Sequence, residues 1–346
     1  PVAHATITSL DVEDARASEG VRAVLTADDL KAAGINGSMT GSVIKNRDGS
    51  MGASPHRPLL AEGKVRFVGE PVAFIVAETL DQARDAAELI DLFYEDLPAK
   101  MDVAAGGETV HADAPDNVAF DWGIGDEAAT EAAFAAADKV VTLEVPDNRI
   151  IVNSLEPRGC YAEWEGDRVH VSCGGQGVWG QKAEIAKLLG LDAANVRVTN
   201  PDIGGGFGMK GFPYPEYTLS AHAARIVGAP VRWMSERTEA MLTDNAGRDL
   251  TSTAEFAFDA NQKIIGYRVH SRCNLGAYNS MFGQFIQSQL FSRVLMGVYD
   301  VQATWLRVEG IYTNTTYVDA YRGAGRPEAI YVLERLIDRA ARELGV

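Results

Sequence analysis

The amino-acid sequence predicts an α+β protein in which two α/β regions with mixed sheets are joined by a linker. Strand-like runs alternate with amphipathic helical segments over residues 1–105 and again over residues 139–346. Residues 106–138 are rich in Gly, Pro, Asp and Ala and have weak periodicity, which favours a connecting segment. With 346 residues, 46% of them hydrophobic and 23% charged, the chain is long enough for two or three domains with real cores.

In the first region the expected strands are residues 21–25, 64–67, 71–76 and 91–94. Thr26 or Asp28 is a suitable cap for a short helix that runs through Lys31. Residues 79–90 form an amphipathic helix, with its alanines and Ile90 on one face. The Gly-Glu-Pro segment at 69–71 is a turn between two strands. Residues 34–57, rich in Gly, Ser, Asn and charge, are expected to be a long loop.

The linker ends in an Ala-rich helix over residues 127–137, and the second region begins with a strand over 139–145. Further strands are expected at 168–172, 195–199 and 230–234, and a hairpin at 250–259 and 263–271. Helices are expected at 178–189, where Gly190 is the C-cap, and at 216–227. Pro327 suits the first turn of a last helix that runs to about residue 344. The apolar stripe expected along this last helix is Ile330, Leu333, Leu336, Ile337 and Ala340.

Composition excludes several classes of function. The net charge of −16 and the pI near 4.8 argue against a nucleic-acid partner, which requires a basic face. The three cysteines, Cys160, Cys173 and Cys273, are far apart, so they form neither a disulfide framework nor an iron–sulfur ligand set. No stretch is long and apolar enough to span a bilayer, and no basic, hydrophobic leader is present. We therefore expect a protein of a reducing compartment, the cytoplasm.

Three glycine-rich loops are the main candidates for a binding site. Gly204-Gly205-Gly206-Phe207-Gly208-Met209-Lys210 and Ala320-Tyr321-Arg322-Gly323-Ala324-Gly325-Arg326 lie about a hundred residues apart, and Cys173-Gly174-Gly175-Gln176-Gly177 lies between a strand and a helix. Glycines allow the backbone to approach a ligand and to present N–H groups to it. Arginines suit contacts with oxyanions. The loops therefore predict a large anionic cofactor that is bound mostly by main chain.

Residues 206–211 also match the GxGxxG pattern of nicotinamide-dependent enzymes. A dinucleotide-binding helix begins inside that motif, however, and here Pro213 and Pro215 follow it at once. A P-loop is excluded by the residues on both sides of Lys210. A nicotinamide-dependent enzyme remains the least favoured alternative.

Taken together, the loops resemble the molybdopterin-binding large subunit of the molybdenum hydroxylases, the xanthine oxidase and aldehyde oxidase family. The strings that carry the resemblance are Asn153-Ser154-Leu155-Glu156-Pro157-Arg158, Gly175-Gln176, Ile203 to Lys210, Arg237 with Asn245-Ala246-Gly247-Arg248-Asp249, and Ala320 to Glu328. The resemblance implies a small α/β "hammerhead" domain over residues 1–105. It implies the first molybdenum-cofactor-binding domain over residues 139–346, with the second such domain outside this chain.

The resemblance also implies roles for individual residues. Gln176 matches a glutamine that hydrogen-bonds an oxo ligand of molybdenum, and Arg322 matches the arginine beside the metal. Both are the expected catalytic residues. Gly206-Phe207-Gly208 matches the loop that faces the oxo ligand and the pterin. The full expected cofactor-binding set is Gly175, Gln176, Gly205, Gly206, Phe207, Gly208, Arg322, Gly323 and Ala324. No side chain of this chain is expected to ligate the metal directly.

The implied activity is oxidation of an aldehyde or an aromatic N-heterocycle by Mo–OH attack and hydride transfer to Mo=S. The implied cofactors are a molybdopterin dinucleotide, in its cytosine form, and 2Fe-2S and FAD on partner chains. The implied partners are an iron–sulfur subunit, an FAD subunit and a second molybdopterin-binding subunit or C-terminal half, which carries the glutamate base. Gly211 stands where purine-oxidising members have glutamate, and Gly323 where copper-containing carbon monoxide dehydrogenases have cysteine. The alternative is a non-catalytic assembly or cofactor-loading module of the same fold.

Overall fold

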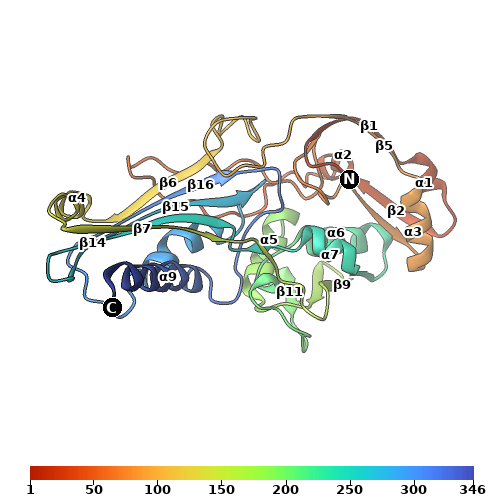
Figure 1. Ribbon diagram of the computed structural model, residues 1–346. Helices are drawn as coiled ribbons and strands as arrows, with labels where there is room; N and C mark the ends of the chain where they lie inside the picture. The colour runs from red at the N-terminus through yellow and green to blue at the C-terminus, as the bar shows by residue number, and fades with distance from the viewer.

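The computed structural model describes residues 1–346, and Figure 1 shows the N-terminal region and the largest sheet at opposite ends of an elongated molecule. In the N-terminal region β1 pairs antiparallel with both β3 and β5, and β2 pairs antiparallel with β4. The elements of this region are β1 (Ala5–Asp11), α1 (Glu13–Ala17), β2 (Val21–Thr26), α2 (Ala27–Ala32), β3 (Lys64–Val65), β4 (Ala73–Ala77), α3 (Leu80–Glu88) and β5 (Asp91–Asp96).

Helix α2 and helix α3 both begin at a capping box, and at α2 the structure chooses Thr26 from the two predicted caps, Thr26 and Asp28. The Thr26 hydroxyl accepts from the Asp29 N–H, and the Thr79 hydroxyl accepts from the Gln82 N–H. The strands predicted on either side of the turn at 69–71 exist as β3 and β4, but each pairs with another strand rather than with its neighbour. Sequence reasoning missed β1 and α1, because the first twenty residues have no clear periodicity.

The middle of the molecule is a mixed four-stranded sheet in the order β11-β10-β9-β12, covered by α5 and α6. Only β10 and β11 run parallel. Gly190 ends α5 in the left-handed conformation, φ 63°, as predicted. The elements are β9 (Gly159–Glu165), β10 (Arg168–Cys173), α5 (Trp179–Leu189), η1 (Ala193–Asn195), β11 (Val196–Thr199), η2 (Met209–Gly211), α6 (Pro215–Val227), β12 (Val231–Met234) and α7 (Arg237–Thr243).

The third part is a mixed five-stranded sheet in the order β6-β16-β15-β14-β7. Helix α9 packs against β7 and β14, and Figure 1 shows it along one face of the sheet, while α4 contacts β15 and β16. The predicted hairpin is β14 and β15, paired antiparallel. The elements are β6 (Val118–Gly125), α4 (Glu127–Ala135), β7 (Lys139–Asp147), β8 (Ile150–Ile151), β13 (Ala246–Gly247), β14 (Leu250–Phe258), β15 (Ile264–Gly276), α8 (Gly283–Phe285), η3 (Ile286–Leu290), β16 (Thr304–Tyr312) and α9 (Arg326–Leu344).

Two expectations need correction. Residues 106–138 are not simply a linker, because β6 is an edge strand of the five-stranded sheet, paired with β16, and α4 packs on the same sheet. On α9, Ile330 is 45% exposed and so does not belong to the buried stripe. The stripe instead includes Ala329 and Val332 beside Leu333, Leu336 and Ala340. Adjacent residues of a helix point about 100° apart, so a shift of one position moves a side chain off the core face.

Two hydrophobic clusters form the main cores. One lies between the five-stranded sheet and α9. The other joins Leu25, Leu30 and Phe74 of the N-terminal region to Val169, Val171 and Ile185 of the middle sheet and α5. The N-terminal region and the middle sheet therefore share one core, and the domain boundaries at 105 and 139 stay a prediction. None of the helices has the length and apolar composition that crossing a membrane requires.

Candidate functional site

The fold brings the three glycine-rich loops together, although more than a hundred residues separate the first from the last. We call residues 173–177 the glutamine loop, 204–211 the glycine loop and 320–326 the arginine loop. The Gly208 N–H donates to the Gln176 Oε1 over 2.8 Å, and the Gln176 N–H donates to the Lys210 carbonyl over 3.0 Å. The Arg322 N–H donates to the Phe207 carbonyl over 2.9 Å. The glycine loop is therefore held between the other two.

Glycine is required at two contacts of these loops. A Cβ on Gly206 would lie 2.4 Å from the Gln176 Oε1, well inside van der Waals contact. Gly208 has a φ of +103°, and a Cβ there would lie 2.6 Å from the Ala320 carbonyl oxygen. Phe207 and Ala324 also have positive φ, 53° and 48°, although neither is glycine. Backbone strain of this kind gathers at ligand-binding sites.

The loops present hydrogen-bond donors that have no partner within the chain. The backbone N–H groups of Gly205, Gly206 and Phe207 make no hydrogen bond, and neither does the side-chain NH₂ of Gln176. The Arg322 guanidinium is exposed and has no carboxylate within 4.0 Å; the closest aromatic contact is the Phe207 ring, whose centroid lies 5.9 Å away. Consecutive free N–H groups beside an arginine form a site for an anion. These donors fit a cofactor that carries oxo, dithiolene and phosphate groups.

Exposed apolar side chains surround the donors. Leu155 is 91% exposed, Trp179 77%, Phe207 45% and Phe282 43%, which is unusual for side chains of this size. The Phe282 ring lies 5.5 Å from the Phe212 ring, which follows the glycine loop. Phe291, by contrast, is fully buried in the core.

Charged side chains behind the loops fix their positions. The Arg158 guanidinium is fully buried, donates to the Asp244 and Glu216 carboxylates over 2.6 and 2.8 Å, and stacks on Tyr214. It also donates to the Thr243 hydroxyl over 2.7 Å and lies over the Trp233 ring. Lys210 is also fully buried and its Nζ lies 2.9 Å from the Glu156 Oε2.

Arg237 and Arg248 both belong to the strings that carry the family resemblance. Neither forms an ion pair with its acidic neighbour in sequence, Glu236 or Asp249. Arg237 donates to the carbonyls of Ser154 and Leu155, so it orders the segment beside the glycine loop. Arg248 lies 3.6 Å from the Asp147 carboxylate and stacks on the Tyr321 ring, at the start of the arginine loop. Both arginines order loops.

Asp319 precedes the arginine loop and is fully buried. Burial raises the pKa of its carboxyl to about 6, although the N–H groups of Phe282 and Ala320 donate to it. The carboxylate thus ties the Phe282 segment to the arginine loop. Sequence reasoning missed this role, as it missed the Glu156–Lys210 pair. Glu156 and Lys210 belong to the strings that carry the family resemblance, whereas Asp319 stands directly before one of them.

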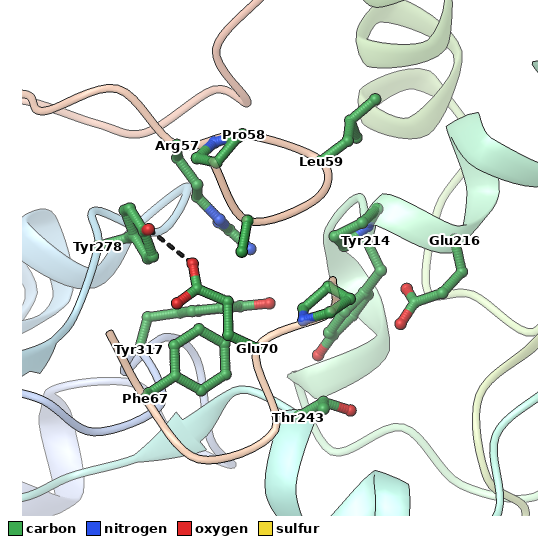
Figure 2. Close-up of a pocket in the computed structure, with 13 residues that line it drawn as sticks. Arg57, Pro58, Leu59, Phe67, Glu70, Tyr214, Glu216, Thr243, Tyr278 and Tyr317 are labelled. Atoms are coloured by element: carbon green, nitrogen blue, oxygen red, sulfur yellow. Dashed lines mark hydrogen bonds between the residues drawn. The ribbon is translucent and has the colours of Figure 1, made fainter. Parts of the chain in front are cut away.

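A separate cavity lies between the N-terminal region and the middle of the molecule (Figure 2). Arg57 and Glu70 both point into it, and the Tyr278 hydroxyl donates to Glu70 over 2.6 Å. The internal space of about 30 Å³ accommodates water but not a cofactor. An open groove of about 450 Å³ lies at the other end of α5 from the glutamine loop, lined by Trp164, Leu191 and His222. Neither hollow includes the three loops.

No group of three or more His, Cys, Asp and Glu side chains is arranged to hold a metal ion. The three cysteines are free and buried. Burial raises the pKa of the Cys160 thiol to about 12 and that of Cys173 to about 11, so neither is a thiolate near neutral pH. The donors at the three loops are therefore the groups on which a metal-containing cofactor would depend.

Comparison with known proteins agrees with this geometry. Residues 110–346 match the family described as molybdopterin cofactor-binding domain, and residues 1–98 match the aldehyde oxidase and xanthine dehydrogenase a/b hammerhead domain. The chain is 33% identical to the nicotine 6-hydroxylase large subunit of Paenarthrobacter nicotinovorans, covering 100% of this chain and 42% of that protein. It is 32% identical to the carbon monoxide dehydrogenase large chain of Hydrogenophaga pseudoflava, covering 100% of this chain and 44% of that one.

Among solved structures, quinoline 2-oxidoreductase from Pseudomonas putida 86 superposes with a TM-score of 0.90 at 32% identity, over 100% of this chain and 44% of that one. The chain thus spans less than half the length of these relatives. The match includes the hammerhead fold and the cofactor-binding fold. The chain belongs to the molybdopterin-binding large subunits of the molybdenum hydroxylase family, the family of xanthine dehydrogenase and aldehyde oxidase.

Proposed function

We propose that the glutamine, glycine and arginine loops together hold the molybdenum end of a molybdopterin dinucleotide. The observation that carries this proposal is their convergence: Gln176 contacts the Gly208 N–H, and the Arg322 N–H contacts the Phe207 carbonyl. This leaves the N–H groups of residues 205–207 and the Arg322 guanidinium without partners on one surface. A group that accepts hydrogen bonds and carries negative charge would satisfy all of them.

Each residue has a distinct task in this proposal. Gln176 uses its Oε1 to fix the glycine loop, which leaves its NH₂ free to donate to an oxygen of the cofactor. Gly205, Gly206, Phe207 and Gly208 bring the main chain close to the cofactor, and Gly175 permits the neighbouring Asn200 side chain to pack beside the glutamine loop. Arg322 stabilises negative charge, and Gly323 and Ala324 leave room on the substrate side.

When bound, the cofactor supplies the redox chemistry of hydroxylation with water as the oxygen source. The chain itself supplies position, hydrogen bonds and positive charge. Two carboxylates that contact the loops or adjoin them are engaged, Glu156 with Lys210 and Asp319 with backbone N–H groups. This supports a general base that comes from outside these residues, from a C-terminal half or a second molybdopterin-binding subunit.

For the substrate we propose an aldehyde or an aromatic N-heterocycle, and favour the heterocycle. The names of two relatives, nicotine 6-hydroxylase and quinoline 2-oxidoreductase, refer to nitrogen heterocycles. The exposed aromatic side chains of Phe207 and Phe282 suit a flat apolar ring. Gly211 and Gly323 bring no carboxylate or thiol to the pocket, which argues against purine and copper-dependent chemistry. We further propose the cytosine dinucleotide form, and electron transfer to iron–sulfur and FAD subunits.

The test is the complete enzyme, isolated from its own source with all its subunits. We expect about one molybdenum per chain, a released cytosine nucleotide, and reduction by an N-heterocycle. In the Gln176→Ala enzyme we expect an altered molybdenum EPR signal. An enzyme that binds no molybdenum would contradict the proposal and favour an assembly module. A molybdenum signal identical in the wild type and the variant would remove Gln176 from the site.

A further inference from the structure

The glycine loop is anchored by an ion pair, Glu156–Lys210, in which the lysine is fully buried and the glutamate side chain is 37% exposed, and to which the sequence assigned no function. Lys210 belongs to this loop and is fully buried, with a side-chain exposure of 0%. Its Nζ lies 2.9 Å from the Glu156 Oε2, the only carboxylate within 4.0 Å. A buried ammonium without a partner is strongly unfavourable, so the position of Lys210 depends on Glu156.

Glu156 also contacts the first glycine of the same loop. Its Oε2 accepts a hydrogen bond from the Gly204 N–H over 2.6 Å, and its own backbone N–H donates to the Gly204 carbonyl over 3.1 Å. A Cβ on Gly204 would lie 2.6 Å from the Cβ of Glu156, too close for two carbon atoms. The backbone of residue 204 can therefore approach Glu156 this closely only because residue 204 is glycine. One carboxylate therefore holds both ends of the glycine loop, residue 204 and residue 210.

The charge state suits this role. Although partial burial opposes it, the hydrogen bonds from Lys210 and the Gly204 N–H hold the pKa of Glu156 below its ordinary value. Glu156 is thus ionised throughout the neutral range. Its main chain is fixed in turn, because Arg237 donates to the carbonyls of the two preceding residues.

The anchored segment is the one with the free donors. Residues 205–207 lie between the two points that Glu156 holds, and their N–H groups have no partner. The Lys210 carbonyl also accepts from the Gln176 N–H, so the position of Lys210 helps to fix the glutamine loop. Donors are most effective in binding when they are held in place before the ligand arrives.

We propose that the Glu156–Lys210 pair is a positioning device that holds the glycine loop ready for the cofactor. Neither side chain needs to touch the cofactor. Glu156 acts through the backbone of Gly204, and the Lys210 side chain fixes its own backbone carbonyl, which accepts from the Gln176 N–H. That the loop is held ready for a cofactor rests on the proposed function. That the ion pair orders the loop does not depend on the proposed function, and it can be measured in the cofactor-free chain.

The test compares two variants of the full chain by amide hydrogen exchange and then by molybdenum content of the complete enzyme. Lys210→Met leaves the Glu156 charge without its partner. We expect exchange of the hydrogen-bonded amides of Gly204, Gly208 and Met209 to become faster by about tenfold or more, with the α6 amides unchanged, and molybdenum content to fall severalfold. The double variant E156Q/K210M has no unpaired charge and keeps an acceptor for the Gly204 N–H. We expect it to fold, with exchange of these three amides still faster than in the wild type, because the ion pair that holds Lys210 is gone.

Arg339→Met is the control, because it removes one partner of an exposed ion pair with Glu343 on α9. We expect it to behave as the wild type. Wild-type exchange of the Gly204, Gly208 and Met209 amides in a folded K210M chain would overturn the proposal. If K210M fails to fold, the double variant decides: faster exchange of these amides than in the wild type supports the proposal, and wild-type protection overturns it. A wild type with an ordered loop but no molybdenum would contradict the proposed function and leave the positioning role intact.

Discussion

The N-terminal region and the three-loop site are built in opposite ways. In the N-terminal region the helices α2 and α3 begin at capping boxes whose partners are three residues apart. At the site, the contacts that join the glycine loop to Gln176, Glu156 and Arg322 all span more than thirty positions in sequence. We expect the first region to tolerate the loss of a local contact, and the site to depend on its distant contacts.

The largest effect should come from Arg158, which links the middle sheet to the segment before β13. Replacing it by Met leaves the buried Glu216 and Asp244 carboxylates without their common partner. We expect the free energy of unfolding to fall by about 3–5 kcal/mol, measured by chemical denaturation. Arg342→Met, which removes an exposed pair with Asp338, should lose less than about 1 kcal/mol. If both variants lost the same free energy of unfolding, the expected difference between a buried and an exposed ion pair would be wrong.

Arg322 should affect activity without affecting the fold. Its side chain is exposed and has no carboxylate partner, so Arg322→Ala removes no contact that stabilises the chain. In the complete enzyme we expect turnover to fall by about 10²–10³-fold, with an unchanged melting temperature. Arg335→Ala, an exposed arginine on α9, is the matched control. Turnover at the wild-type level in the R322A enzyme would exclude the role proposed for this arginine.

His111 should make stability depend on pH. Burial lowers the pKa of its imidazole to about 4, while the ring stays hydrogen-bonded to the Ala277 carbonyl. The unfolded chain, with a histidine pKa near 6.5, therefore binds the extra proton first as the pH falls. The contribution of the neutral, buried His111 to the free energy of unfolding is complete above pH 6.5 and is lost as the pH falls from 6.5 to about 4. We expect the wild type to lose about 3 kcal/mol more than His111→Gln over this window, in urea titrations.

The smallest effect should come from the N-terminal region. Thr79→Ala removes the hydroxyl that accepts from the Gln82 N–H at the start of α3. We expect a loss of about 1 kcal/mol in the free energy of unfolding, and wild-type molybdenum content in the complete enzyme. Thr79→Ser keeps the hydroxyl and should restore most of the loss. A drop in molybdenum content on T79A would show that the two regions are more tightly coupled than their contacts indicate.

The sequence by itself determined the elements whose signals are local. The helix at 79–90, the cap at Thr26, the C-cap at Gly190 and the β14–β15 hairpin were all predicted, because each depends on residues a few positions apart. The sequence also singled out the three loops, since glycines beside arginine, phenylalanine and lysine are recognisable without a structure. The family resemblance then linked these three loops to known cofactor-binding loops.

Tertiary structure decided what depends on distant contacts. Strand β6 was expected to lie in a linker because its pairing partner, β16, comes almost two hundred residues later. Ile330 left the core stripe because the packing of α9 on β7 and β14, rather than its periodicity, sets which face is buried. The Glu156–Lys210 pair was invisible for the same reason: a carboxylate and an ammonium fifty-four residues apart give no signal until folding places them 2.9 Å from each other.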